Sequence, residues 1–355
     1  MTDEPLKILI VDDSRIFRSV IEEALSGRDD VRVVGSVWNG EKAVEFARAS
    51  LPDFVTLDIE MPGMGGIATL RALRELAQNR ERTIGILLVS LHTKRDAAIT
   101  VEGLEEGAFD FISKPTGPDT LANAASLKEQ LLEKIKAFRS RRKVSPALKA
   151  LRDKKPATQK NESRFRAIVI GSSTGGPEAI ARLLPVLTPG CRVPIFLVQH
   201  LPENFTHYFA TSLARRCGTE IVEATEGTIP RPGVVYVAQG GKHLILTRQD
   251  QRVVMSFCDS PPENGCRPSV DVLFRSAAAV YGGSVLAVIL TGMGTDGALG
   301  AITLKRMGAH VIVQDEESSI VWGMPGSVVA ANAADEVLPI EDIGPALRAH
   351  LGIEG

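Results

Sequence analysis

The stretch Ile8-Leu9-Ile10-Val11-Asp12-Asp13 joins a continuous apolar run to two adjacent carboxylates. An apolar run without polar alternation is typical of a parallel strand that is buried on both faces of a sheet. Phe17, Ile21 and Leu25 follow at helical spacing, so a helix is expected next. Further strands are predicted at residues 31–37, 54–57, 84–89 and 109–112, and a last helix at about 119–140. Strands that alternate with helices indicate a doubly wound parallel sheet in the first third of the chain.

The same alternation resumes near residue 165 and predicts a second doubly wound parallel sheet. Its strands are expected at residues 167–170, 194–198, 234–237, 243–246, 285–290 and 310–313, with helices at 177–187 and 298–307. The predicted fold class is therefore α/β, with two domains at residues 1–140 and 165–355. The length of 355 residues agrees with two domains, because one domain usually takes ~150 residues.

Residues 141–164 are predicted to be a linker between the two domains, because they show little apolar periodicity. The surrounding stretch 134–166 holds 13 Lys and Arg against two acidic residues, a local charge of +11, although the whole chain carries -2. An arm that binds nucleic acid is the alternative interpretation of such a basic run. A solvated tether is favoured, since no aromatic residue lies between Arg141 and Arg164 to stack on bases.

The composition is that of an ordinary soluble globular protein, with 44% hydrophobic and 24% charged residues. This composition excludes a largely disordered chain. The net charge of -2 argues against a protein that binds nucleic acid over its whole surface. No apolar stretch approaches the ~20 residues that span a bilayer. Asp3 and Glu4 precede the first apolar run, where a signal peptide would have basic residues. Four cysteines without a C-x-x-C pair are expected to be reduced. We therefore expect a cytoplasmic protein that neither binds nucleic acid nor inserts into a membrane.

Three carboxylates are expected to converge at the carboxyl edge of the first sheet. Asp12 and Asp13 follow the first strand, and Asp58 follows the third. The three negative charges repel one another, and a bound cation would offset this repulsion. Carboxylate oxygens are ligands that suit Mg2+. Ser90 and Lys114 follow the fourth and fifth strands, and the whole set can hold a phosphoryl group and offset its charge. Taken singly, Asp13 could cap the following helix and Lys114 could belong to a plain turn.

A candidate nucleophile lies in the second domain, within Gly171-Ser172-Ser173-Thr174-Gly175-Gly176 between a predicted strand and a predicted helix. This segment fits G-x-S-x-G, the sharp turn that presents a serine over a sheet, and the pattern selects Ser173. A phosphate-binding loop would use similar glycines, but this segment matches neither G-x-G-x-x-G nor G-K-[ST]. The segment therefore favours a serine nucleophile.

A serine nucleophile needs a base within about 3 Å and a third group that orients the base. His200 is the candidate base, because among the six histidines only His200 ends a buried strand. Asp296 is the candidate third group, because it lies in the glycine-rich Thr291–Gly297 loop after another buried strand. Each residue also has a plain interpretation as part of a turn. The order Ser…His…Asp disfavours an ordinary α/β-hydrolase, which would need a late histidine such as His310 or His350.

Residues 5–125 resemble a response-regulator receiver domain, which has a flavodoxin-like fold, through the five strand-end residues and the loop Asp58–Gly66. The resemblance implies that Asp58 accepts a phosphoryl group from a histidine kinase. The implied ligands of Mg2+ are Asp12, Asp13 and Asp58. The implied contacts of the phosphoryl group are Ser90 and Lys114, and the implied aromatic that changes position upon activation is Phe111.

Five motifs of the second domain occur in the order found in chemotaxis protein-glutamate methylesterases, the CheB family. They are Gly171–Gly176, Gln199–Pro202, Arg267–Phe274, Thr291–Gly297 and Gly323–Pro325. With the receiver ahead of them, the whole chain except the linker is similar to this family. The resemblance implies an α/β serine esterase that hydrolyses glutamate γ-methyl esters of chemoreceptors, releases methanol and also deamidates receptor glutamines.

The resemblance also assigns roles to single residues. Ser173 is implied to be the nucleophile, His200 the general base and then acid, and Asp296 the residue that orients His200. Backbone amides near Thr174 and Met293 are implied to form the oxyanion hole. The implied partners are a chemotaxis histidine kinase and methyl-accepting chemoreceptors, and no cofactor is expected in the esterase site.

Two other classes of protein agree less well with the sequence. A transcriptional response regulator would need a compact helix-turn-helix module after the linker, but residues 165–355 are too long and too rich in strands. A binding module without catalysis is disfavoured because the serine, histidine and aspartate candidates are all present. For the esterase, two tethered domains can occlude each other, so the receiver is expected to cover the catalytic face until Asp58 is phosphorylated.

Overall fold

The computed structural model describes residues 4–91, 93–115, 120–140 and 164–353. The chain divides into two units, Met1–Arg142 and Lys143–Gly355. The predicted linker, apart from residue 164, lies outside the described residues. Within the described part of the chain, no helix is both long enough and apolar enough to cross a membrane.

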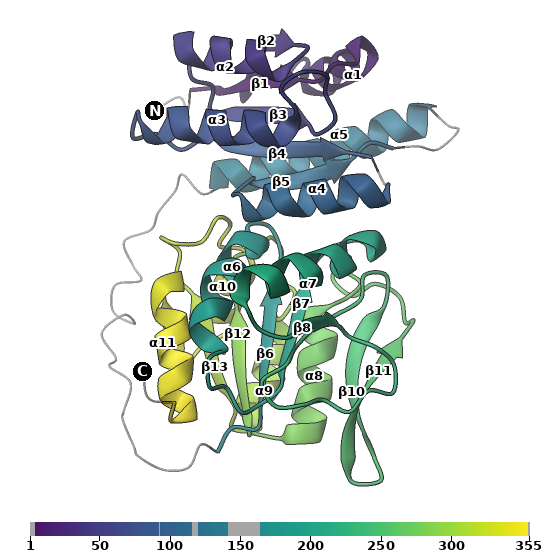
Figure 1. The fold of residues 1–355 in the computed structure, drawn as a ribbon, viewed down its shortest axis with the longest axis vertical. Helices are drawn as coiled ribbons and strands as arrows, with labels where there is room; N and C mark the ends of the chain where they lie inside the picture. The colour runs from purple at the N-terminus through teal and green to yellow at the C-terminus, as the bar shows by residue number, and fades with distance from the viewer. Residues whose placement is uncertain (1–3, 92, 116–119, 141–163, 354–355) are drawn as a thin grey trace. The chain divides into compact units, whose positions relative to one another are not determined.

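The first unit contains a five-stranded parallel sheet with strand order β2-β1-β3-β4-β5 (Figure 1). Its strands are β1 (Leu6–Val11), β2 (Val31–Val37), β3 (Phe54–Asp58), β4 (Gly85–Ser90) and β5 (Asp110–Ser113). Its helices are α1 (Arg15–Leu25), α2 (Gly40–Ala49), α3 (Gly66–Gln78), α4 (Lys94–Glu105) and α5 (Thr120–Ser140). This is the 2-1-3-4-5 order of flavodoxin-like folds, so the predicted fold class is confirmed for this unit.

The elements of the first unit follow from local sequence signals. Every side chain of β3 and β4 is buried, as expected for strands that are covered on both faces. Ser14 precedes α1, and its hydroxyl accepts a hydrogen bond from the Phe17 N–H. The cap of α1 is therefore Ser14 and not Asp13, which leaves the Asp13 carboxylate available at the edge of the sheet.

The second unit contains a seven-stranded parallel sheet with order β14-β13-β12-β6-β7-β9-β8. Its strands are β6 (Ala167–Ser172), β7 (Ile195–Gln199), β8 (Ile221–Glu223), β9 (Val235–Val237), β12 (Val285–Ile289), β13 (His310–Gln314) and β14 (Glu336–Leu338). Its helices are α6 (Gly176–Leu187), α7 (Glu203–Cys217), α8 (Val270–Tyr281), α9 (Ala298–Arg306), α10 (Met324–Ala330) and α11 (Ile340–Leu351). Helices α6, α7 and α11 pack in one layer, and α8, α9 and α10 in another. The fold class predicted for this unit is confirmed as well.

The strand order of the second sheet reverses at β6. The chain leaves β6 toward β7 on one side and later returns through β12 on the other side. Right-handed crossovers then carry the following helices to opposite faces, so the loops after β6 and β12 diverge at the carboxyl edge. Open α/β sheets bind their ligands at such a point. Ser173 lies in the first of these loops, and Asp296 lies in the second.

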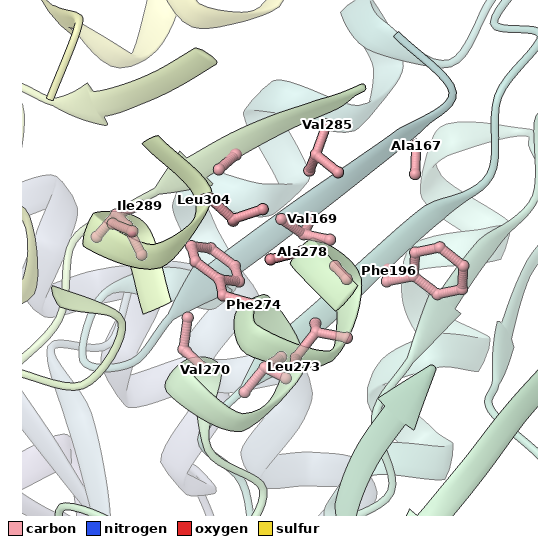
Figure 2. Close-up of a cluster of buried hydrophobic side chains, with 14 of the residues drawn as sticks. Ala167, Val169, Phe196, Val270, Leu273, Phe274, Ala278, Val285, Ile289 and Leu304 are labelled. Atoms are coloured by element: carbon pink, nitrogen blue, oxygen red, sulfur yellow. The ribbon is translucent and has the colours of Figure 1, made fainter. Parts of the chain in front are cut away.

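A buried apolar cluster fixes α8 against the central strands (Figure 2). Phe274 of α8, Val169 of β6 and Ile289 of β12 are fully buried in this cluster. Burying one such side chain contributes about 1.5–3 kcal/mol. The start of α8 at Val270 is thereby held beside the strands whose loops carry the candidate site.

One predicted strand does not belong to the parallel sheet. Residues 243–246 are part of β10 (His243–Gln249), which pairs antiparallel with β11 (Arg252–Cys258) in a separate two-stranded sheet. Asp250 and Gln251 form the connecting turn, with positive φ angles of 44° and 67°. A two-residue hairpin turn of this kind is usually marked by glycine or asparagine. Asp250 also suits the first position of such a turn, but Gln251 stands where glycine is usual, so the sequence gives only a weak sign of the hairpin.

Candidate functional site

The three predicted aspartates of the first unit meet at the carboxyl edge of its sheet. Asp12 follows β1, and Asp58 ends the neighbouring strand β3. One carboxylate oxygen each of Asp12, Asp13 and Asp58 lies within 4.8 Å of the others. Lys114 joins them, with its Nζ 2.9 Å from Asp12 Oδ2 and 2.8 Å from Asp58 Oδ2. The structure therefore brings four of the predicted residues into one pocket.

This pocket is suited to a hard divalent cation. Burial raises the pKa of Asp58, the Lys114 ammonium lowers it and the Asp12 carboxylate raises it, with a result of about 6. The Lys114 ammonium thus does not offset the cost of burying the Asp58 carboxylate beside Asp12. All donors are oxygens, which suit Mg2+ or Ca2+ better than a thiophilic metal. A cation bound here would favour the ionised form of Asp58.

Ser90 and Phe111 lie on the two strands that follow β3 in the sheet. Ser90 ends β4, where its hydroxyl donates to the Leu91 carbonyl at 3.0 Å and accepts from Thr100 Oγ1 at 2.9 Å. Among the described residues, Ser90 makes no hydrogen bond to the three aspartates. Phe111 lies in β5 and is half-buried. Because the order of strands is β3-β4-β5, these two residues are one and two strands away from Asp58.

In the second unit, the structure distinguishes the two serines of the loop after β6. Ser172 is buried, and its hydroxyl donates to Gln199 Oε1 at 2.8 Å. Gln199 Nε2 in turn donates to the Ser173 carbonyl oxygen at 3.0 Å. A Cβ added to Gly176 would lie 2.1 Å from Gln199 Oε1, so this close approach requires glycine. Ser172 therefore anchors the loop, whereas Ser173 is half-buried and is left for chemistry.

Asp296 is buried and is held by the start of α8. Its carboxylate accepts hydrogen bonds from the Ser269 hydroxyl at 2.7 Å, the Val270 N–H at 2.7 Å and the Asp271 N–H at 3.1 Å. The amino end of a helix stabilises a negative charge of this kind. His200 follows β7, and its Nε2 lies 2.8 Å from Asp296 Oδ2. The structure thus brings the candidate base and its candidate orienting group together.

His200 and Asp296 stabilise each other's charged forms. Burial lowers the pKa of His200, but hydrogen bonds with Asp296 and Cys266 outweigh burial and raise it to about 9. Burial raises the pKa of Asp296, but hydrogen bonds from His200, the Val270 N–H and Ser269 outweigh burial and lower it to about 2. Such a pair favours the imidazolium that a general base becomes once it has taken a proton.

Ser173 and His200 lie in adjacent loops but share no hydrogen bond within the described part of the chain. The His200 backbone N–H donates to the Ser172 carbonyl at 3.1 Å, which places the two loops side by side. The second ring nitrogen of His200, Nδ1, lies 3.5 Å from Cys266 Sγ. Catalytic hydrogen bonds are often long before substrate binds. Because Nε2 faces Asp296, Nδ1 is the ring nitrogen on the other side of His200 from that carboxylate.

Thr174 and Met293, near which the oxyanion hole is expected, lie in the loops after β6 and β12. The Thr291 hydroxyl donates to the Thr174 carbonyl at 3.0 Å and ties these two loops together. A Cβ added to Gly292 would lie 3.0 Å from Ser173 Cβ. The backbone that leads into Met293 therefore passes close to the candidate nucleophile.

The loop that carries Met293 is fixed by the start of α10. The Gly292 carbonyl accepts hydrogen bonds from the Gly323 N–H at 3.0 Å and the Met324 N–H at 2.8 Å. A Cβ added to Gly323 would lie 2.8 Å from the Gly292 carbonyl oxygen, so a larger residue would push the loop away. This gives the Gly323–Pro325 motif a physical role next to the site.

Residues around the site that were not predicted to act in it include Gln199, Ser269 and Cys266. Gln199 and Ser269 lie inside quoted motifs, and Ser269 also shows the signal of a helix cap, because its hydroxyl accepts a hydrogen bond from the Val272 N–H at 3.4 Å. Cys266 is 66 residues from His200 in the chain. Their contact exists only in the folded protein, and no local sequence signal indicates it.

The late histidines are not part of this site. His310 is the first residue of β13, so it lies at the amino edge of the parallel sheet. His350 lies in the last turn of α11, which returns to that same edge. The order of residues found in ordinary α/β-hydrolases therefore does not apply to this chain.

Comparisons with known proteins match both units. A family model described as CheB methylesterase matches residues 168–347, and one described as response regulator receiver domain matches residues 8–126. The chain is 40% identical to the protein-glutamate methylesterase/protein-glutamine glutaminase of Nocardioides sp. strain JS614, over 98% of this chain and 95% of that one. It is 38% identical to the protein of that name from Trichodesmium erythraeum, over 98% of this chain and 99% of that one. The crystal structure of the Thermotoga maritima CheB methylesterase catalytic domain matches with a TM-score of 0.51 and 41% identity, covering 52% of this chain and 97% of that domain.

The matched ranges contain both candidate sites. The acidic pocket lies within the range of the receiver, and Ser173, His200 and Asp296 lie within the range of the methylesterase. The relatives match over nearly the full length of the chain, so they share both parts. The chain therefore belongs to the CheB methylesterase family and carries a response-regulator receiver domain ahead of its methylesterase domain.

Proposed function

We propose that the chain is a phosphorylation-regulated esterase that hydrolyses glutamate γ-methyl esters of methyl-accepting chemoreceptors and also deamidates receptor glutamines. The observation that carries this proposal is the His200–Asp296 pair at 2.8 Å, held beside the loop of Ser173. The names of the full-length relatives, protein-glutamate methylesterase/protein-glutamine glutaminase, supply the substrate class.

In the proposed reaction, Ser173 Oγ attacks the ester carbonyl while His200 Nδ1 takes the hydroxyl proton. The tetrahedral intermediate collapses, the bond to the methoxy oxygen breaks, and His200 returns the proton so that methanol leaves. Water then attacks the acyl-serine with His200 again as the base, which frees the glutamate carboxylate and restores Ser173. With a glutamine side chain the leaving group is ammonia.

Backbone amides support the charge that develops on the carbonyl oxygen. We assign this role to the N–H groups near Thr174 and Met293, because Thr174 follows Ser173 directly and Gly292, which precedes Met293, lies beside Ser173. Donors that are already in place cost no reorganisation during the reaction, and one such donor is worth ~10²–10³-fold in kcat. The α10 start that holds Gly292 would position the Met293 amide.

The first unit is proposed to act as the switch. Asp58 would accept a phosphoryl group from a chemotaxis histidine kinase. Lys114 and Ser90 would contact this phosphoryl group, and the Phe111 ring would change position upon activation. Asp12, Asp13 and Asp58 would hold Mg2+, which when bound offsets the charge on the transferring phosphoryl group. In this proposal the receiver spans residues 1–140, the linker 141–164 and the catalytic domain 165–355, and the protein acts in the cytoplasm.

A fluorophosphonate probe tests the nucleophile directly, because it reacts with a serine that an adjacent base activates. The full chain is incubated with the probe, digested and mapped by mass spectrometry. We expect one labelled serine, Ser173, and loss of labelling in Ser173→Ala but not in the control Ser260→Ala, which changes an exposed serine outside the site. Labelling of another residue, or none in the wild type, would contradict the proposed nucleophile.

A further inference from the structure

Three metal-ligating side chains meet at the amino edge of the second sheet, at the end opposite to the catalytic loops. His310 begins β13, Glu336 begins the neighbouring strand β14, and His350 lies in the last turn of α11. The mechanism uses none of them. The catalytic loops follow the carboxyl ends of β6, β7 and β12, so the two sites are separated by the length of the strands.

Both imidazoles point at the same carboxylate oxygen. His310 Nε2 lies 2.5 Å and His350 Nε2 lies 2.7 Å from Glu336 Oε1. The centroids of the two imidazole rings are 4.3 Å apart. One nitrogen of each histidine and one carboxylate oxygen thus lie within 4.8 Å of one another.

The Glu336 carboxylate is only partly satisfied by these contacts. Its side chain is 10% exposed, and its second oxygen, Oε2, is buried without a hydrogen-bond partner among the described residues. A buried acceptor without a partner costs free energy, and each such case calls for an explanation. A cation between the three side chains would engage this carboxylate and replace the two N–H donors.

The surroundings fix the ligands in place. The Phe165 ring packs edge-on against His350, with centroids 6.1 Å apart. Asp335 Oδ2 lies 3.9 Å from His310 Nδ1, on the ring side that faces away from Glu336. Histidine ligands of metals commonly have a carboxylate near the nitrogen that does not bind the ion. At 3.9 Å the Asp335 carboxylate is a nearby negative charge and not a hydrogen-bond acceptor for His310, since its Oδ2 accepts from the Val311 N–H at 2.8 Å.

The set of donors selects the metal. Two imidazole nitrogens and one carboxylate oxygen are ligands that Zn2+ prefers, whereas Mg2+ and Ca2+ prefer oxygen ligands alone. Ligand atoms around a tetrahedral Zn2+ lie about 3.3 Å apart, given bond lengths of about 2.0 Å. Each histidine Nε2 would need to move away from Glu336 Oε1 by less than about 1 Å to reach this spacing, and a water molecule would complete the tetrahedron.

We propose that His310, Glu336 and His350 bind one Zn2+ ion that clamps α11 to the edge of the sheet. The ion links the last helix of the chain to two strands, and α11 also packs against α6. A ligand that binds the folded state and not the unfolded state raises the melting temperature, and the rise grows with the logarithm of the free ligand concentration above its Kd. The clamp is thus a stabilising site, independent of the esterase reaction.

The test uses the full chain without a histidine tag, treated with a chelator and then titrated with Zn2+. We expect one equivalent of Zn2+ to bind and the melting temperature to rise by several degrees. Binding and the rise should disappear in His350→Ala and in Glu336→Gln. Both should persist in His207→Ala, a control that removes an exposed histidine of α7.

A second metal probe separates this site from the catalytic cluster of His200, Cys266 and Asp296, which also offers three ligands. Co2+ bound through nitrogen and oxygen gives visible d–d bands without the ultraviolet charge-transfer band of a thiolate ligand. We expect the bands without the thiolate signal, and unchanged binding in Cys266→Ala. A thiolate band, loss of binding only in Cys266→Ala, or no bound Zn2+ in the wild type would overturn the proposal. The wild-type titration decides even where a variant fails to fold.

Discussion

At the scale of single residues, the Asp296 carboxylate organises the esterase site. It accepts hydrogen bonds from the start of α8 and from Ser269, and it holds His200 Nε2 at 2.8 Å. These contacts keep Asp296 ionised and raise the pKa of His200 to about 9. A base must be neutral to accept a proton, so the rate should depend on the fraction of neutral His200.

The first prediction concerns this pH dependence. The kcat/KM of the wild type should rise with pH through the alkaline range toward pH 9, because His200 loses its proton there. In Asp296→Asn the carboxylate that raises the pKa of His200 is gone, so the rising limb should move to lower pH. Its maximum should fall by ~10³–10⁴-fold, because the imidazole loses its orientation and its counter-charge. If the rising limb of the kcat/KM profile stayed at the same pH in Asp296→Asn, the assignment of His200 and Asp296 as a pair would be contradicted.

The second prediction concerns Cys266, whose Sγ lies 3.5 Å from His200 Nδ1. An alkyl group on this half-buried thiol would occupy the space in which His200 meets Ser173. Iodoacetamide should therefore abolish methyl-ester hydrolysis by the wild type. The reagent should not inhibit Cys266→Ala, even though the half-buried Cys258 thiol, whose pKa is lowered by a hydrogen bond with Ser260, still reacts. Equal inhibition of both proteins would assign the effect to another cysteine.

At the scale of elements, helix α8 links the core to the site. Its apolar side chains pack on the central strands, and its first N–H groups hold Asp296. Helix α9 approaches α8 closely at Gly300, where an added Cβ would lie 2.5 Å from Phe274 Cβ. The Gly300 N–H also donates to Asp271 Oδ1 at 2.6 Å. A shift of either helix would therefore reach the Asp296 carboxylate of the candidate site.

The third prediction tests this contact between helices. Gly300→Ala should lower the free energy of unfolding by ~1–3 kcal/mol, because the new methyl group overpacks the interface. The control Leu299→Ala changes a neighbouring side chain that is 58% exposed, and it should change stability by less than about 0.5 kcal/mol. Urea unfolding of both variants measures the difference. A Gly300→Ala variant as stable as the control would mean that the helices separate without cost.

Much of this architecture could be predicted from local sequence. The apolar run before Asp12 predicted β1, and the G-x-S-x-G turn selected Ser173 over Ser172. The β10–β11 hairpin could not be predicted, because its turn at Asp250 and Gln251 carries no glycine. Contacts between distant segments, such as Cys266 with His200, depend on the assembled sheet and leave no periodic signal.

At the scale of the whole molecule, two parallel-sheet units with different chemistry are joined in one chain. The first gathers carboxylates around Asp58, and the second gathers a histidine and an aspartate beside a serine loop. The net charge of -2 describes neither part, because residues 134–166, which span the junction between them, carry +11. Because the two candidate sites lie in different units of one chain, regulation of one by the other has to be tested on the intact chain.

The fourth prediction concerns this regulation. A small phosphodonor with Mg2+ should raise the methylesterase rate of the full chain, because a phosphoryl group on Asp58 adds charge to the receiver. Asp58→Asn should keep the basal rate and lose the response, and removal of Mg2+ should abolish the response of the wild type. Stimulation that survives in Asp58→Asn would place the phosphorylated residue elsewhere.

The most direct test of the central claim is methanol release from a methylated chemoreceptor. The account predicts methanol release by the wild-type chain and a loss of at least ~10³-fold in Ser173→Ala, since the nucleophile and its base act as a unit. Methanol release by Ser173→Ala at the wild-type rate, or none by the wild type with phosphodonor and Mg2+, would contradict it.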